Sequence, residues 1–82
     1  MAIRLEKETE TRLLESIQRY CREEMDLDVG DLKAQLLLDF CLREIAPCAY
    51  NRAVVDVQRV LTDRVSDLQS DCYEPEFGYW KD

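Results

Sequence analysis

The 82-residue chain contains no histidine, and only two glycines and two prolines interrupt it. Histidine is the commonest general acid–base residue and a frequent zinc ligand, so its absence removes many familiar catalytic and metal sites. Neither glycine belongs to a phosphate-binding loop with its lysine. Ser16, Ser66 and Ser70 have no catalytic base at a recognisable spacing. We therefore expect a protein that is not an enzyme, with no catalytic residues and no cofactor.

Long apolar runs are also missing, and no stretch approaches the 18 residues of a membrane-spanning helix. Residues 1–10 carry acids where a secretory signal would be basic. The net charge of −7 repels phosphate backbones and anionic lipids, and the 11 lysines and arginines are scattered among acids. We expect a cytoplasmic protein that binds neither nucleic acid nor membrane.

The four cysteines form no CxxC pair, and no histidine could complete a zinc site with them. Cys21, Cys41, Cys48 and Cys72 lie on or beside apolar helix faces, where a free cysteine packs as a small hydrophobic residue. Disulfides are not expected in a reducing cytoplasm. A redox pair of Cys41 and Cys48, on either side of a predicted turn, is the alternative.

Asp26, Asp28 and Asp31 superficially suggest a calcium-binding loop. In the EF-hand pattern glycine stands at the sixth position and glutamate at the twelfth. Here Gly30 is at the fifth position and Leu37 at the twelfth. We therefore predict no metal site.

The apolar periodicity predicts an all-α protein with three helices, at about residues 7–24, 31–45 and 47–71. Asp31 is the expected N-cap of the second helix, which is apolar around most of its circumference and hence buried. Ala46-Pro47 is expected to end that helix, because a residue before proline avoids helical dihedral angles. The third helix would then fold back beside the second.

The expected domain covers residues 1–72, and its third helix would be roughly 37 Å long against about 22 Å for the second. Part of the third helix's apolar face therefore needs another surface, most simply a second copy of the chain. Residues 73–82 form an acidic tail with four aromatic side chains, which either folds over the bundle or docks on a partner. The predicted interface comprises Leu61, Val65, Leu68, Cys72, Tyr73, Phe77 and Trp80.

Asp39 interrupts the apolar sequence of the second helix, and a partly buried carboxylate needs partners. Arg43, Tyr50 and Asn51 are the expected partners in a structural polar network, across the turn at Pro47. A ligand-binding or metal-binding role for Asp39 is the alternative.

The sequence GDLKAQLLLDF at residues 30–40, followed by EIAP and then Tyr50-Asn51, resembles the bacterial domain-of-unknown-function family two-one-six-four. Ile3-Arg4-Leu5 and residues 20–24 are also similar to it, so the resemblance covers roughly residues 3–72. Ala46 stands where the family pattern has glycine, and Glu6 where it has a serine cap. The resemblance implies a small helical bacterial protein and brings no assigned activity.

Two functional hypotheses follow. The first is a homodimeric interaction or adaptor module without catalytic activity, in which another protein partner is possible. The second is an acidic regulatory protein that binds a basic partner protein. A mimic of nucleic acid needs acids along one exposed face, whereas Arg52 and Arg59 interrupt the polar face of the third helix. The charge pattern therefore favours the first hypothesis.

Overall fold

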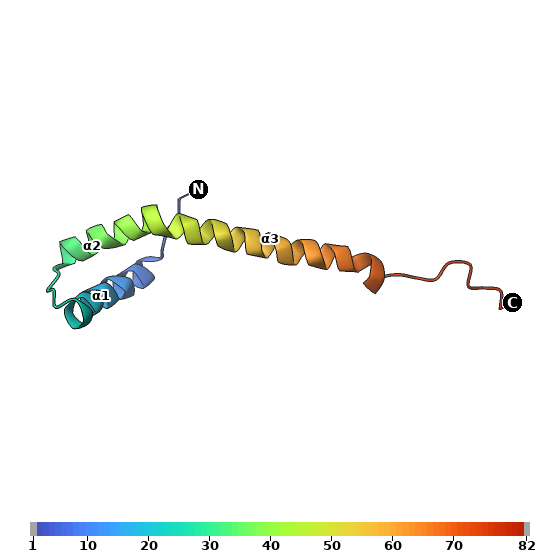
Figure 1. Cartoon of the computed structure of the whole chain (residues 1–82), viewed down its shortest axis with the longest axis horizontal. Helices are drawn as coiled ribbons and strands as arrows, with labels where there is room; N and C mark the ends of the chain where they lie inside the picture. Colours follow the sequence, from blue (N-terminus) through green and yellow to red (C-terminus); the bar gives the residue numbers. More distant parts are fainter. Residues whose placement is uncertain (1, 82) are drawn as a thin grey trace. The chain divides into compact units, whose positions relative to one another are not determined.

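The computed structural model describes residues 2–81, and within them all regular secondary structure is helical (Figure 1). The α-helix α1 spans Lys7–Glu24, and α2 spans Asp31–Phe40. A π-helical segment, η1, covers Cys41–Ile45, and α3 covers Ala46–Asp71. The predicted all-α class is confirmed.

The prediction of three helices is wrong, because α2, η1 and α3 follow one another without a break. The described chain therefore has two helices, α1 and one uninterrupted helix from Asp31 to Asp71. Pro47 lies inside the second of these helices rather than in a turn.

The π-helical segment explains how the helix passes through Pro47. A proline in a helix has no N–H to donate, and its ring crowds the carbonyl of the residue four positions earlier. In η1 the Ala46 N–H bonds to the Cys41 carbonyl, one residue further back than in an α-helix. A wider turn of this kind leaves room for the proline ring beside the Arg43 carbonyl, and the helix can continue without the hydrogen bond that proline cannot donate.

The structure divides into two units, of which the first covers residues 1–51. Its main feature is an antiparallel hairpin of α1 and α2. Asp26 adopts a left-handed backbone conformation with φ of 52° and ends α1. The Cys21 carbonyl then accepts two N–H groups at the helix end, from Met25 at 3.2 Å and from Leu27 at 2.9 Å.

Two glutamine side chains join α1 to the residues beyond it. The Gln18 amide donates to the Val29 carbonyl at 3.1 Å and to Asp31 Oδ1 at 2.9 Å. The Gln35 amide donates to Glu10 Oε1 at 2.9 Å. Asp31 therefore accepts a hydrogen bond from Gln18 and is the first residue of α2, whereas the N-cap is Gly30. The N-cap prediction for Asp31 is wrong by one residue, because the first helical hydrogen bond already runs from the Ala34 N–H to the Gly30 carbonyl at 3.0 Å.

The core of the first unit is small. Its buried residues are Cys21 from α1 and Ala34 and Leu38 from α2. Ala34 is completely buried, at 0 % exposure, and its small side chain lets the two helices approach closely. The hairpin thus packs along one narrow line, and most of the apolar side chains of α2 stay exposed. The near-complete burial predicted for that helix is therefore not found in the single chain.

The second unit covers residues 52–82. Its part of α3 runs from Arg52 to Asp71, and the described residues after it form turns and irregular backbone. Every residue described in this unit is exposed, so it has no buried core of its own.

Candidate functional site: an apolar helix face and a pocket beside the π-helical segment

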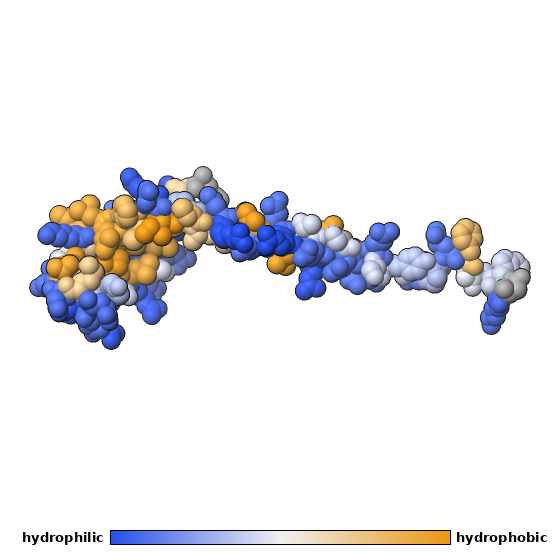
Figure 2. Space-filling view, viewed as in Figure 1, coloured by the Kyte–Doolittle hydropathy of each residue, from blue (hydrophilic) through white to orange (hydrophobic). Residues whose placement is uncertain are grey.

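An exposed apolar face runs along α3 in the second unit, and we call it the α3 stripe. Its members recur at intervals of three or four residues, which places them on one side of the helix. Leu61 is 60 % exposed and Val65 is 66 % exposed. Figure 2 shows hydrophobic patches along this helix among hydrophilic residues. The α3 stripe consists of Val54, Val57, Leu61, Val65 and Leu68.

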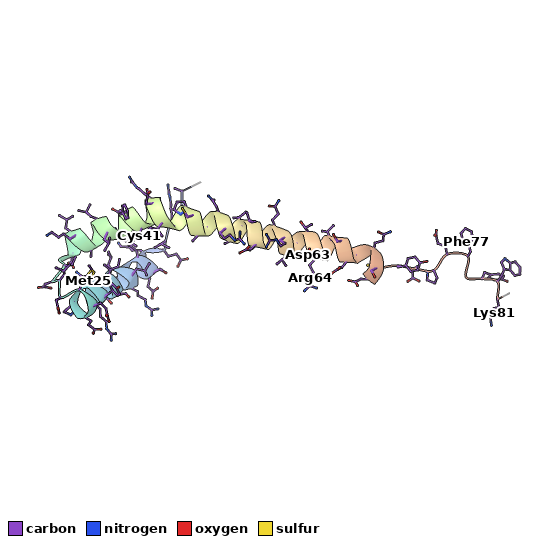
Figure 3. The ribbon with its side chains drawn as sticks, viewed as in Figure 1. Met25, Cys41, Asp63, Arg64, Phe77 and Lys81 are labelled. Atoms are coloured by element: carbon purple, nitrogen blue, oxygen red, sulfur yellow. The ribbon has the colours of Figure 1, made fainter. Side chains whose placement is uncertain are left out.

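The opposite side of α3 carries charges of both signs. The Arg52 guanidinium lies 3.4 Å from Asp56 Oδ1, and the Arg59 guanidinium lies 3.8 Å from the same oxygen. Asp63 continues this face, whereas Arg64 borders the α3 stripe; both are labelled in Figure 3. Such exposed pairs add little stability, typically less than about 1 kcal/mol each. They do keep this side of the helix hydrated.

The tail residues of the predicted interface are also exposed. Phe77 is 96 % exposed, and its backbone is left-handed with φ of 56° (Figure 3). The rings of Tyr79 and Trp80 meet edge to face, with their centroids 4.7 Å apart. Cys72 and Tyr73, at the end of α3 and the start of the tail, are exposed as well. The predicted interface stays a prediction, since no partner chain is present.

The four residues of the predicted polar network line one pocket in the first unit. Asp39, Arg43, Tyr50 and Asn51 are among the residues that line a half-open pocket of about 680 Å³. The uninterrupted helix explains this grouping, because residues 39, 43, 47 and 50 recur at helical spacing on one side. Within residues 2–81, however, no hydrogen bond joins these four side chains to one another.

Asp39 lies in a different environment from the one expected. It is exposed rather than partly buried, and its carboxylate accepts a hydrogen bond at 3.1 Å from Gln35, one turn earlier in α2. The expectation of partners across a turn is wrong because α3 continues the helix instead of folding back.

Cys41 and Cys48 are not brought together either. Seven residues apart on a continuous helix, they are separated by about 10 Å along its axis, beyond the reach of a disulfide. Cys41 is half-buried and Cys48 is exposed, and the Cys48 thiol donates to the Glu44 carbonyl at 3.8 Å. Cys21 is the buried cysteine of the hairpin, as expected for a small apolar side chain.

Metal-binding side chains do not gather in the part of the chain that the structure describes. Among residues 2–81 no three cysteines, aspartates or glutamates are placed to hold an ion. None of the described helices combines the length and the apolarity that crossing a membrane requires.

Three residues that contribute to the hairpin or the pocket were not identified from the sequence. Gln18 and Gln35 join the hairpin, and Arg4 lines the pocket. The glutamines lie on helical faces next to apolar positions, a weak signal for a cross-helix contact. Arg4 precedes the first helix, so no periodicity indicates where its side chain lies.

The fold and these surfaces define an all-helical protein with an exposed apolar helix face. A comparison with protein families identifies the chain further. Residues 3–76 match the model of a family described as "Uncharacterized conserved protein (DUF2164)". The chain belongs to this family, as the resemblance indicated. No curated protein and no solved structure matched the chain.

Proposed function

We propose that the chain is a protein–protein interaction module without catalytic activity, and that it acts as a homodimer paired through the α3 stripe. The observation that carries the proposal is the exposure of this face in a unit that has no buried residue. Isolated helices are marginally stable in water, and most helical stability in proteins comes from packing an apolar face. The second unit therefore needs a surface to pack against.

Burial of the α3 stripe would contribute substantially to the stability of the chain. Complete burial of a valine or leucine side chain contributes about 1.5–3 kcal/mol. The five residues of the α3 stripe are each roughly half exposed. Covering them would contribute about 5 kcal/mol per chain. A sum of this size is comparable to the whole stability of a small domain.

A second copy of the chain suits this face better than a strongly charged partner. The stripe has the spacing of a helix that packs along another helix, from Val54 to Val57 to Leu61 and again at Leu68. In a twofold dimer the same surface meets itself. The ion pairs of Arg52 and Arg59 with Asp56 lie on the opposite side of α3, so pairing through the α3 stripe leaves these charges in water.

Two neighbouring residues provide a matched test. Val65 belongs to the α3 stripe, whereas Ser66 faces the other side of the same helix. We expect Val65→Glu to convert the dimer to a monomer in sedimentation equilibrium, because a carboxylate would be buried without a partner. Ser66→Glu should remain dimeric. A Val65→Glu protein that stays dimeric would show that the interface lies elsewhere.

The alternative function, an acidic regulator of a basic protein, is favoured by one feature. Four acids at the end of α1 and in the following loop are exposed: Glu23, Glu24, Asp26 and Asp28. This function predicts salt-sensitive binding to a basic polypeptide such as polylysine. Replacing these four acids by amides should abolish that binding and leave the homodimer intact.

A further inference from the structure

The pocket beside η1 has the size and composition of a small-molecule site. Its volume of about 680 Å³ falls within the range of about 300–1,000 Å³ typical of ligand pockets. All of its lining residues belong to the first unit, so it does not depend on the second. The segment before α1 forms one wall, and the other comes from the long helix around η1. The lining residues are Ala2, Ile3, Arg4, Asp39, Leu42, Arg43, Pro47, Tyr50 and Asn51.

The π-helical turn contributes to this site. A π-helical turn is rare in proteins and frequently accompanies a functional site. Here it lies between Asp39 on one side and Pro47 and Tyr50 on the other. Leu42 and Arg43 of η1 themselves line the pocket.

The polar side chains around the pocket favour a negatively charged group. Arg4 and Arg43 both line it, and neither guanidinium forms an ion pair within residues 2–81. Guanidinium groups bind carboxylates and phosphates through paired hydrogen bonds. Tyr50 and Asn51 add a hydroxyl and an amide donor. Asp39 is the one acidic residue among the lining residues, so the lining carries two positive charges and one negative charge.

The rest of the lining is apolar. Ile3, Leu42 and Pro47 offer a hydrophobic surface beside the guanidinium groups. An inorganic ion would bury none of this apolar surface, whereas an organic anion would cover it and bind more tightly. We propose that the pocket binds a small organic anion, in which a carboxylate or phosphate contacts Arg4 and Arg43 and an apolar body covers Ile3, Leu42 and Pro47.

Calorimetric titration of the full chain with simple probes tests this site. Phenyl phosphate and benzoate carry the two oxyanions on the same aromatic body, and the tighter of the two identifies the preferred group. Benzyl alcohol has the body without the charge, and inorganic phosphate has the charge without the body. We expect at least one aromatic anion to bind roughly tenfold or more tightly than either of these two controls.

Arginine variants locate the binding. Arg4→Gln and Arg43→Gln should each lower the affinity for the aromatic anion at least roughly tenfold, since each removes a charge-assisted contact. Arg19→Gln is the matched control. Arg19 lies in the same unit but does not line the pocket, and its guanidinium lies 3.1 Å from the Glu23 carboxylate. This variant should bind normally. Arg4 precedes α1, so its replacement changes no residue of a helix, and circular dichroism should show an unchanged helix content.

Several results would overturn the proposal. Equal binding of benzyl alcohol would mean that the pocket selects no charge, and equal binding of inorganic phosphate would mean an adventitious ion only. Unchanged affinity in Arg4→Gln and Arg43→Gln, or no binding of either aromatic anion at millimolar concentration, would also contradict it. Because the pocket lies within one chain, these results leave the proposed homodimer untouched, and sedimentation equilibrium of the same variants tests that separately.

Discussion

Gln35 of α2 donates a hydrogen bond of 2.9 Å to the Glu10 carboxylate of α1, and this contact links residues 25 positions apart in the sequence. The same amide group donates to Asp39 at 3.1 Å. One neutral donor therefore lies between two carboxylates in the partly buried line where the helices meet. We therefore expect the hairpin to require an uncharged donor at position 35.

Replacing Gln35 by glutamate should destabilise the hairpin. The variant would lose both hydrogen bonds and place a third carboxylate beside Glu10 and Asp39, so we expect a loss of about 1–3 kcal/mol in the free energy of unfolding. Urea denaturation at neutral pH measures this loss. Gln69→Glu, in the exposed part of α3, should change stability by less than about 0.5 kcal/mol. Equal effects of the two changes would rule out a special role for Gln35.

Two leucines of α2 test where its core lies. Leu38 is buried at 4 % exposure, whereas Leu32 is among the most exposed residues of the helix. Leu38→Ala should lower the free energy of unfolding by about 2–5 kcal/mol, because it leaves a cavity against α1. Leu32→Ala should lower it by less than about 1 kcal/mol. Thermal and urea unfolding of both variants compare them, and a larger loss for Leu32→Ala would contradict the packing of the hairpin.

Pro47 tests the uninterrupted helix. We expect Pro47→Ala to keep the helix content seen by circular dichroism and to raise the free energy of unfolding by about 1–3 kcal/mol, because the missing N–H is restored. Proline two residues later, in Ala49→Pro, should lower stability by about 3 kcal/mol or more, since no π-helical turn precedes that position closely enough to accommodate it. Were Pro47 in a turn, Pro47→Ala would instead change the helix content.

Thiol reactivity distinguishes the cysteines. Cys48 is exposed and lies away from the α3 stripe, whereas Cys21 is buried between α1 and α2. We expect Cys48 to react with a small thiol reagent much faster than Cys21 in the folded protein, as exposure controls access to the sulfur. Mass spectrometry of peptides after timed labelling measures both rates. Similar rates in folded protein, and equal rates after denaturation, would contradict the burial of Cys21.

The helical content was predictable from the sequence because apolar residues recur at three and four positions over long segments. The continuation of the helix through Pro47 was not predictable, because a π-helical turn that accommodates the ring outweighs the local preference of the residue before proline. Helix periodicity alone cannot indicate such a turn. The same error placed the partners of Asp39 across a loop that does not exist.

The candidate site was predictable in part. Asp39, Arg43, Tyr50 and Asn51 were selected from the sequence, and all four line the pocket. They meet through helical spacing rather than through hydrogen bonds. Arg4 could not be found, since a residue in an extended segment carries no periodic signal for its neighbours. The hydrogen bond from Gln35 to Glu10 depends on how closely the two helices pack at the buried Ala34, which the sequence pattern does not indicate.

The most direct test of the proposed homodimer is the molar mass from light scattering after size exclusion, measured over a wide range of dilution. The chain has a mass of 9.7 kDa. We expect twice this value at high concentration, with an unfolding temperature that falls on dilution, because folding and pairing are linked. A mass of one chain at every concentration, together with a cooperative and concentration-independent unfolding transition, would contradict the proposal.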